Sequence, residues 1–275
     1  MAIVLVVLGV FVLLAANFRP NGSFEASGET ETPAQVQLDA FVLDINPAEY
    51  TARLRLRIVD IDPAFLNADG RLTEPVRIAV TSSDGTDDVV FPAGSALGRA
   101  EVSIGLSGEE SGYPFDVHRA NLTINPAIPA VVTGDPTRAY LTTAVRVDAD
   151  SPGWSILVDI AGQGTDDVAM AITLERETTV KVVTFLVLFI GLTLAISALV
   201  IGVAVQGGRQ PVDSSILGWA AGLVFTLLAL RFYLPGEPPI GSGIDVFGFL
   251  WVIVFAFLGM GLLVWAWLRR PQNSA

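Results

Sequence analysis

Hydrophobic and polar positions divide the chain into two kinds of sequence. Three long apolar runs, Val180–Val205, Ile216–Leu234 and Val246–Leu268, end the chain, and a shorter one, Ile3–Ala16, begins it. Each of the three C-terminal runs is long enough to cross a bilayer, which takes roughly 20 apolar residues. Between Val36 and Thr178, hydrophobic and polar residues alternate instead. This pattern predicts a membrane protein with a β-domain inserted between its apolar segments.

The alternating region is typical of short β-strands separated by turns. Its clearest part, Ala52–Ile58, places arginines on one face and aliphatic residues on the other, as in an antiparallel sheet with one solvated face. Turn signals at Ala68-Asp69-Gly70 and Ser83-Asp84-Gly85 interrupt the pattern. The expected strands are Val36–Ile45, Thr51–Asp60, Val76–Thr81, Ala100–Leu106, Asn121–Asn125, Arg138–Asp148, Trp154–Ile160 and Val168–Glu175. About eight short strands predict an all-β sandwich.

The changes in pattern also set the expected domain boundaries. We expect an N-terminal transmembrane anchor or signal segment at 1–17, a Gly/Ser/Thr/Glu-rich linker at 18–35, an extracytoplasmic β-sandwich at 36–178, three transmembrane helices within 179–270 and a cytoplasmic tail at 271–275. Leu14-Ala15-Ala16 resembles a signal cleavage site, but no basic residue precedes the apolar run, so an uncleaved anchor and a cleaved signal both remain open.

Topology follows from the charges beside the helices. With the β-domain outside, Arg209 and the pair Arg269-Arg270 lie inside, as the positive-inside tendency requires. The loop Pro235–Asp245 is then outside, on the side of the β-domain. Tryptophans Trp251, Trp265 and Trp267 lie toward the ends of the last helix, where interfacial tryptophans are common. We therefore expect a multi-pass plasma-membrane protein.

Composition removes most catalytic classes. Among 275 residues there is no cysteine and one histidine, His118. A thiol nucleophile, a histidine-based zinc site and a Ser-His-Asp triad therefore have too few members. The net charge of −12 comes from the β-domain and argues against binding to nucleic acid. We expect no cofactor and no metal, and an enzyme is the least favoured class.

Small residues form stripes on two of the helices. They are Gly191, Ala195, Ala198 and Gly202 on the first helix, and the GxxxG pair Gly218 and Gly222 on the second. Small faces let helices approach closely, either within one chain or between subunits. Thr193 and Ser197 could line a polar path or could bond to their own helix backbone.

Arg231 is the one charge well inside an apolar run. An ionisable residue within a membrane segment is a functional hypothesis by default. However, Arg231 precedes Pro235 by only four residues. It could therefore extend outward toward the interface or pair with Glu237 or Asp245.

A short motif, Tyr113-Pro114-Phe115-Asp116, with His118 two residues later, follows a Gly/Ser-rich loop and precedes an expected strand. Phe115 and Pro114 would place the loop against an apolar neighbour, while Asp116 can close a turn through its own backbone.

Two families are similar to the chain at these residues. The motif, together with Arg231 and the segment Leu234–Gly241 up to Asp245, resembles a family of bacterial and fungal multi-pass membrane proteins known only as a domain of unknown function. The similarity covers the whole layout and implies architecture without an activity. Separately, Tyr113–Asp116 resembles the signature loop of pentameric ligand-gated ion channels, which also place a β-sandwich before their helices.

The channel resemblance implies a contact between the Tyr113–Asp116 loop and the Pro235–Asp245 loop. The residues that would couple the β-domain to the membrane are Tyr113, Pro114, Phe115, Asp116, His118, Arg231, Pro235, Gly236, Pro238, Pro239 and Asp245. The chain departs from those channels in having three helices after the domain rather than four, and its second helix lacks the hydroxyl-lined stripe of a pore.

These observations favour a non-enzymatic integral membrane protein that scaffolds or assembles envelope components. Its expected partners are the lipid bilayer and either further copies of itself or other envelope proteins. The last expected strand ends at Glu175-Arg176-Glu177 and runs almost directly into the first helix, which would couple the two mechanically. The alternative is an oligomeric channel or sensor in which the β-domain acts on the external loop 235–245.

Overall fold

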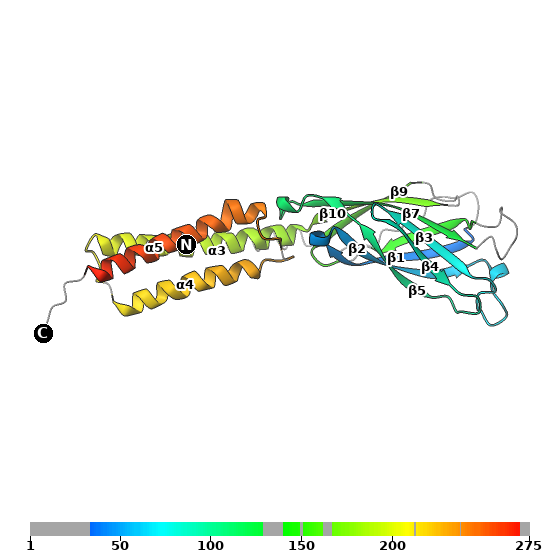
Figure 1. Cartoon of the computed structure of the whole chain (residues 1–275), viewed down its shortest axis with the longest axis horizontal. Coiled ribbons are helices and arrows are strands. Elements are labelled where there is room, and N and C mark those ends of the chain that lie inside the picture. The colour runs from blue at the N-terminus through cyan, green and yellow to red at the C-terminus, as the bar shows by residue number, and fades with distance from the viewer. Residues whose placement is uncertain are drawn as a thin grey trace. The chain divides into compact units, whose positions relative to one another are not determined.

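The computed structural model describes residues 34–128, 140–148, 151–161, 167–211, 213–236 and 238–269 (Figure 1). The expected N-terminal segment, nearly all of the linker, the C-terminal tail and Glu237 lie outside the described residues. The described chain forms two compact units, a β unit within residues 34–109 and 116–176 and a helical unit within 110–115 and 177–269.

The β unit consists of two sheets. The first sheet has the order β5-β2-β1-β8, with β1 (Val36–Asn46), β2 (Thr51–Ile61), β5 (Arg99–Gly105) and β8 (Thr143–Asp148). The second has the order β4-β3-β7-β10-β9, with β6 beside the start of β7; its strands are β3 (Val76–Ser82), β4 (Gly85–Phe91), β6 (Ser107–Gly108), β7 (Val117–Ala127), β9 (Trp154–Ala161) and β10 (Val168–Arg176).

One hydrophobic core joins the inward residues of both sheets, so the unit is β-sandwich-like. β2 shows why the alternation predicts this arrangement. Its aliphatic residues are buried, while Arg53, Arg55 and Arg57 point outward and pair with acidic residues of the neighbouring strands β1 and β5. Such cross-strand pairs add little stability at the surface but keep the outer face soluble.

Two features of the sheets differ from the prediction. The first sheet is not wholly antiparallel, because β1 and β8 pair in parallel, from Val36 with Thr143 to Phe41 with Asp148. A parallel pair needs a long connection, and alternation within one strand does not reveal its partner. The second feature is β4, which forms a hairpin with β3 around Gly85. β4 was not predicted because most of its residues are exposed and several are polar. One of the polar residues, Asp88, pairs with Arg77.

Three long helices form the rest of the described chain. They are α3 (Thr178–Gln206), α4 (Ser214–Phe232) and α5 (Leu250–Leu268), the last continuing from a π-helical turn at Asp245–Phe249. All three are long and apolar enough to cross a membrane. The bounds of α3 and α4, and those of α5 together with its π-helical turn, agree with the three predicted runs to within two residues.

Small residues bring α3 and α5 close together. Gly191, Ala195, Ala198 and Gly202 are buried on one face of α3. A Cβ added at Gly259 of α5 would lie 2.6 Å from the carbonyl carbon of Ala198, and one at Gly202 would lie 2.8 Å from the Gly259 oxygen. The α3 stripe therefore packs within the chain, which is the first of the two interpretations offered above.

The GxxxG pair of α4 behaves differently. Gly218 and Gly222 are exposed, and a Cβ at either meets nothing within 4 Å among the described residues. For this pair the described structure does not show packing within the chain, and the alternative, an interface between subunits, stays a prediction. Thr226, Thr193 and Ser197 each bond to the carbonyl four residues earlier. This is the back-bonding expected of membrane hydroxyls and gives no polar path.

Gly259→Ala should destabilise the helical unit by about 1–3 kcal/mol, because the new methyl group meets backbone rather than a movable side chain. Gly261→Ala is the matched control, since a Cβ there meets nothing within 4 Å in the described structure. Both variants can be compared by denaturant unfolding in a mild detergent, followed by circular dichroism. Equal stability of the two variants would contradict the close α3–α5 approach.

Candidate functional site

The segment Glu110–Phe115 lies between β6 and β7 in the sequence, yet it belongs to the helical unit. Its Tyr113 is almost fully buried at 3% exposure. The phenol oxygen lies 2.6 Å from the Pro235 carbonyl oxygen and 2.7 Å from Oγ1 of the fully buried Thr184. A carbonyl only accepts, so the phenol donates to Pro235 and can accept from Thr184.

Apolar residues from all three helices surround the Tyr113 ring. They are Val180 on α3, Leu234 after α4, and Ile244 and Phe249 at the start of the last helix. On the outer side of the segment, Phe115 is exposed and its ring lies 5.9 Å from that of Phe185. The Tyr113–Pro114 peptide bond is cis, and Pro114 is buried. The Glu110–Phe115 segment thus packs against the ends of the three helices, and this contact is called the Tyr113 seat below.

Arg231 closes the loop that follows α4. Its Nε and Nη2 atoms lie 2.7 and 2.9 Å from the two carboxylate oxygens of Asp245. Nη2 also donates to the carbonyls of Pro238 and Pro239, and the backbone N–H of Gly241 donates to Asp245. Asp245 is therefore the partner of Arg231, while Glu237, the other candidate, lies outside the described residues. This bidentate geometry is specific to arginine.

Asp116 belongs to the β unit, whereas Tyr113 and Pro235 belong to the helical unit, so its expected contact with Pro235–Asp245 stays a prediction. It begins the second part of the β unit, where one carboxylate oxygen lies 3.1 Å from Nε of Arg176 and 3.2 Å from Nε2 of His118. The Arg176 guanidinium stacks 3.8 Å from the centre of the Trp154 ring. All three ionisable groups are buried, so their mutual contacts replace water.

Arg176 and Trp154 were not among the sequence-predicted site residues, although a signal existed for the arginine. The inward positions of β10 are Val168, Met170, Ile172, Leu174 and then Arg176. A charge that continues an inward-facing series must find a partner in the interior. Its partner, Asp116, is distant in sequence.

The pKa of Asp116 lies below its ordinary value of 3.8. Burial alone would raise this pKa, but the hydrogen bond from His118 and the charge and hydrogen bonds of Arg176 outweigh it. The carboxylate only accepts, so Nε2 of His118 carries the proton. Nδ1 is buried and finds no hydrogen-bond partner among the described residues. A Cβ at Gly108 would lie 2.6 Å from it, so only glycine fits there.

The depressed pKa predicts an acid-sensitive β unit. A carboxyl group with a lowered folded pKa contributes stability that is fully present above its unfolded pKa, near 3.8, and is lost as the pH falls through the folded value. The stability difference between the wild type and Asp116→Asn should therefore be large at pH 7 and shrink below about pH 4. Chemical unfolding at a series of pH values measures it. A difference that stays constant down to pH 2 would contradict this role for Asp116.

Within the described residues the chain passes between the two units at three places, 109/110, 115/116 and 176/177. The chain leaves the helical unit between Phe115 and Asp116 and enters it again after Arg176. Within the β unit, Asp116 and Arg176 are ion-paired. Within the helical unit, Tyr113 is hydrogen-bonded to Thr184 of α3. The contacts in each unit are buried and polar, and among these residues Nδ1 of His118 is the side-chain atom that lacks a partner in the described structure.

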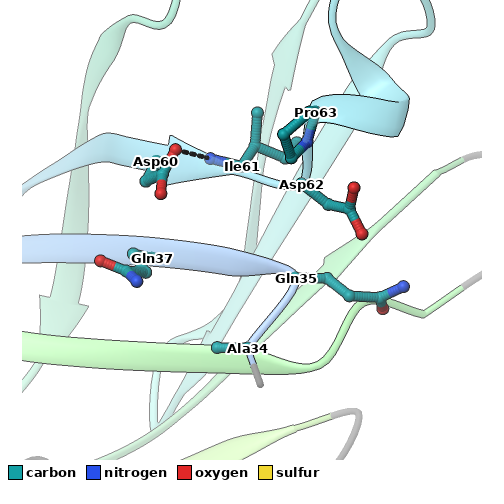
Figure 2. A pocket seen from close by; sticks show the side chains of 7 residues that line it. All are labelled: Ala34, Gln35, Gln37, Asp60, Ile61, Asp62 and Pro63. Atoms are coloured by element: carbon teal, nitrogen blue, oxygen red, sulfur yellow. Dashed lines mark hydrogen bonds between the residues drawn. The ribbon is translucent and has the colours of Figure 1, made fainter. Parts of the chain in front are cut away.

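Hollows elsewhere in the β unit contain none of these residues. The pocket in Figure 2, of about 270 Å³, lies where β1 begins and β2 ends. Its Asp60 and Asp62 accept the backbone N–H groups of Ile61 and Ala64, which is ordinary turn chemistry. A shallower hollow of about 550 Å³ lies along β7 and β10. Across the described residues, no group of three or more acidic or histidine side chains could hold a metal ion.

A β-sandwich-like unit followed by three membrane-length helices defines a class of membrane protein with a folded β-domain attached. Residues 26–174, more than half of the chain, match the family described as Domain of unknown function (DUF4436), and the chain belongs to that family. Residues 176–270 match a second one, Domain of unknown function (DUF8686). The expected membership in an uncharacterised family is thus confirmed. No curated protein matches the chain.

Proposed function

We propose that the protein is a non-enzymatic module of the plasma membrane that scaffolds or assembles envelope components. In this proposal the three helices span the bilayer, the β unit is extracytoplasmic and the C-terminus is cytoplasmic. The position of Arg209 between α3 and α4, and of Arg269 after α5, supports this orientation through the positive-inside tendency.

The observation that carries the proposal is the seating of Tyr113. A segment between two β-strands is built into the ends of three membrane-length helices through a buried, doubly hydrogen-bonded phenol. The fixing of this inter-strand segment within the helical unit supports a scaffold role. No described cluster combines a nucleophile, a base and an open cavity, so a binding and assembly role fits better than catalysis.

Capture from native membranes tests the scaffold role. The tagged full-length protein would be cross-linked in its own membranes, purified and weighed together with its partners. A stoichiometric envelope partner should be retained by the wild type and reduced in Tyr113→Phe, which keeps the ring but loses both hydrogen bonds. Tyr140→Ala is the control, because Tyr140 is half exposed in the β unit. Purification of the protein without any stoichiometric partner would contradict the proposal.

The contact between the Glu110–Phe115 segment and the helix ends can be tested with engineered cysteines. The natural sequence has no cysteine that would compete in the reaction. A Cβ at Gly243 would lie 3.0 Å from the carbonyl oxygen of Ser111. Ser111→Cys combined with Gly243→Cys should therefore react with a short thiol cross-linker in high yield. The control pair, Ser111→Cys with Ser215→Cys, uses the opposite end of α4 and should not react. Equal cross-linking yields for the two pairs would contradict the contact between Ser111 and Gly243.

A channel or sensor is the second candidate, and the hydrogen bond from Tyr113 to Pro235 favours it. This bond joins the segment before β7 to the loop after α4, as the coupling hypothesis requires. The exposed pair Gly218 and Gly222 leaves α4 a face for further copies of the chain. Light scattering in a mild detergent, corrected for bound detergent, distinguishes the candidates: a discrete ring-sized oligomer favours the channel, and a monomer or dimer excludes a pore.

A further inference from the structure

Large apolar side chains are exposed where the helical unit carries its connecting loop. Tyr233 at the end of α4 is 81% exposed, Ile240 in the loop 88%, and Phe247 in the π-helical turn 83%. Phe232, before Tyr233, is also exposed. Scattered single exposures need no explanation, but here four such residues gather within one short stretch of chain. They indicate a surface that a partner covers.

The loop that carries Ile240 is folded back toward the helix ends. Arg231 donates hydrogen bonds to the carbonyls of Pro238 and Pro239, which precede Ile240. The N–H of Gly241, which follows Ile240, donates to Asp245. Ile240 is thus fixed between two restrained neighbours rather than carried on a free loop. Its exposure is a consequence of the fold.

The described charges of this region compensate each other. Arg231 and Asp245 are about 15% and 17% exposed and neutralise each other. Glu237 is the remaining charged residue of the loop sequence. A surface with a largely neutralised charge, several prolines and exposed aromatic rings suits the headgroup layer of a bilayer, where amphipathic rings are enriched. It does not suit the hydrocarbon core, where a charge would be costly.

The spacing of aromatic residues along the last helix fits a bilayer between two such layers. Trp265 and Trp267 lie at the far end, with the Arg269 guanidinium 4.3 Å from the Trp265 ring centre. From Phe247 to Trp265 or Trp267 a helix rises about 27–30 Å. The hydrocarbon core of a bilayer is about 30 Å thick. Phe247 therefore lies one membrane thickness from the opposite aromatic group.

We propose that the described loop residues 235–236 and 238–245, with Tyr233 and Phe247 on either side, are embedded in the lipid headgroup layer, with Ile240 inserted toward the acyl chains. The partner of this surface is a phospholipid monolayer, because the surface continues the lipid-facing sides of α4 and α5. This inference rests on the proposed membrane insertion. It places the Arg231–Asp245 pair and the Pro235 acceptor of Tyr113 at the bilayer surface, not in bulk water.

Spin labels on single cysteines test the location, since the natural chain has none to remove. Ile240→Cys, Phe247→Cys and two references would be labelled in the full-length protein and reconstituted into phosphatidylcholine vesicles. Val200→Cys, exposed in the C-terminal half of α3, is the lipid reference, and Asp69→Cys, exposed in a turn of the β unit, is the aqueous reference. Collision with oxygen, which dissolves in lipid, is compared with collision with a water-soluble nickel chelate.

The labels at 240 and 247 should collide with oxygen several-fold more, relative to nickel, than the label at 69, and less than the label at 200. A nickel collision rate at 240 equal to that at 69 would place the loop in water and overturn the inference. Poor collision with both reagents would mean that protein covers the loop, which also overturns it. If the labels at 200 and 69 show the same ratio of oxygen to nickel collisions, the proposed membrane insertion of the helices is wrong.

Discussion

Asp116→Ala should destabilise the β unit by about 3–5 kcal/mol, because it removes the carboxylate that pairs with the buried charge of Arg176. Arg176 is 4% exposed and is enclosed by Trp154 and the core. Its guanidinium cannot turn to water without leaving the interior. The loss should appear as an earlier unfolding transition of the full-length protein in detergent, followed by tryptophan fluorescence, or as failure to accumulate.

Two further variants separate this effect from a general loss of charge. Asp88→Ala breaks an Arg–Asp pair of the same type, but Arg77 and Asp88 are about half exposed, so its effect should be barely measurable. The double variant Asp116→Ala with Arg176→Met removes both charges and should recover much of the lost stability. If Asp116→Ala proves as mild as Asp88→Ala, the buried pair does not support the β unit.

Arg231→Ala should cause the second large loss, about 3 kcal/mol or more, because it leaves the carboxylate of Asp245 and two loop carbonyls without their donor. The loop after α4 should then open and the Tyr113 seat should loosen, since Pro235 belongs to that loop. Thermal stability and monodispersity in detergent measure the effect. The yield of the Ser111–Gly243 cysteine cross-link should fall in the same variant.

Arg231→Lys provides the chemical control. A lysine keeps the positive charge but cannot make two parallel bonds to Asp245 while also donating to Pro238 and Pro239. It should therefore recover only part of the stability. Arg209→Ala, at an exposed arginine in the loop between α3 and α4, should leave stability unchanged. Full recovery by lysine would mean that charge alone, rather than geometry, holds the loop.

The sequence predicted the elements well, because each element expresses its own pattern. Continuous apolar runs identify α3, α4 and α5, and alternation identifies β2 from Ala52 to Ile58. β4 was not predicted, because the exposed Asp87 and Asp88 interrupt the alternation of hydrophobic and polar residues in this strand. The parallel pairing of β1 with β8 was not predicted, because strand pairing depends on residues far apart in the chain.

The candidate site was predictable only in part, for a related reason. The position of Arg231 in an apolar run and its distance from Asp245 suggest a pair, which the structure contains. The division of the motif at Asp116 could not be read from four consecutive residues. Tyr113 takes its partners from Thr184 and Pro235, while Asp116 takes one from Arg176. Tyr113 and Asp116 are three residues apart, yet these partners lie more than 50 residues away in the sequence.

The parallel pairing of β1 with β8 also sets an order of events during synthesis. β1 lies inside the first sheet, between β2 and β8, so that sheet is incomplete until residues 143–148 have left the ribosome. At about 5–20 residues per second, β1 would wait roughly 5–20 s for its second partner. The strand is thus exposed to mispairing for that time. The acceptor at Pro235 is made later still, so Tyr113 can reach its final partners only after the β-domain has been synthesised.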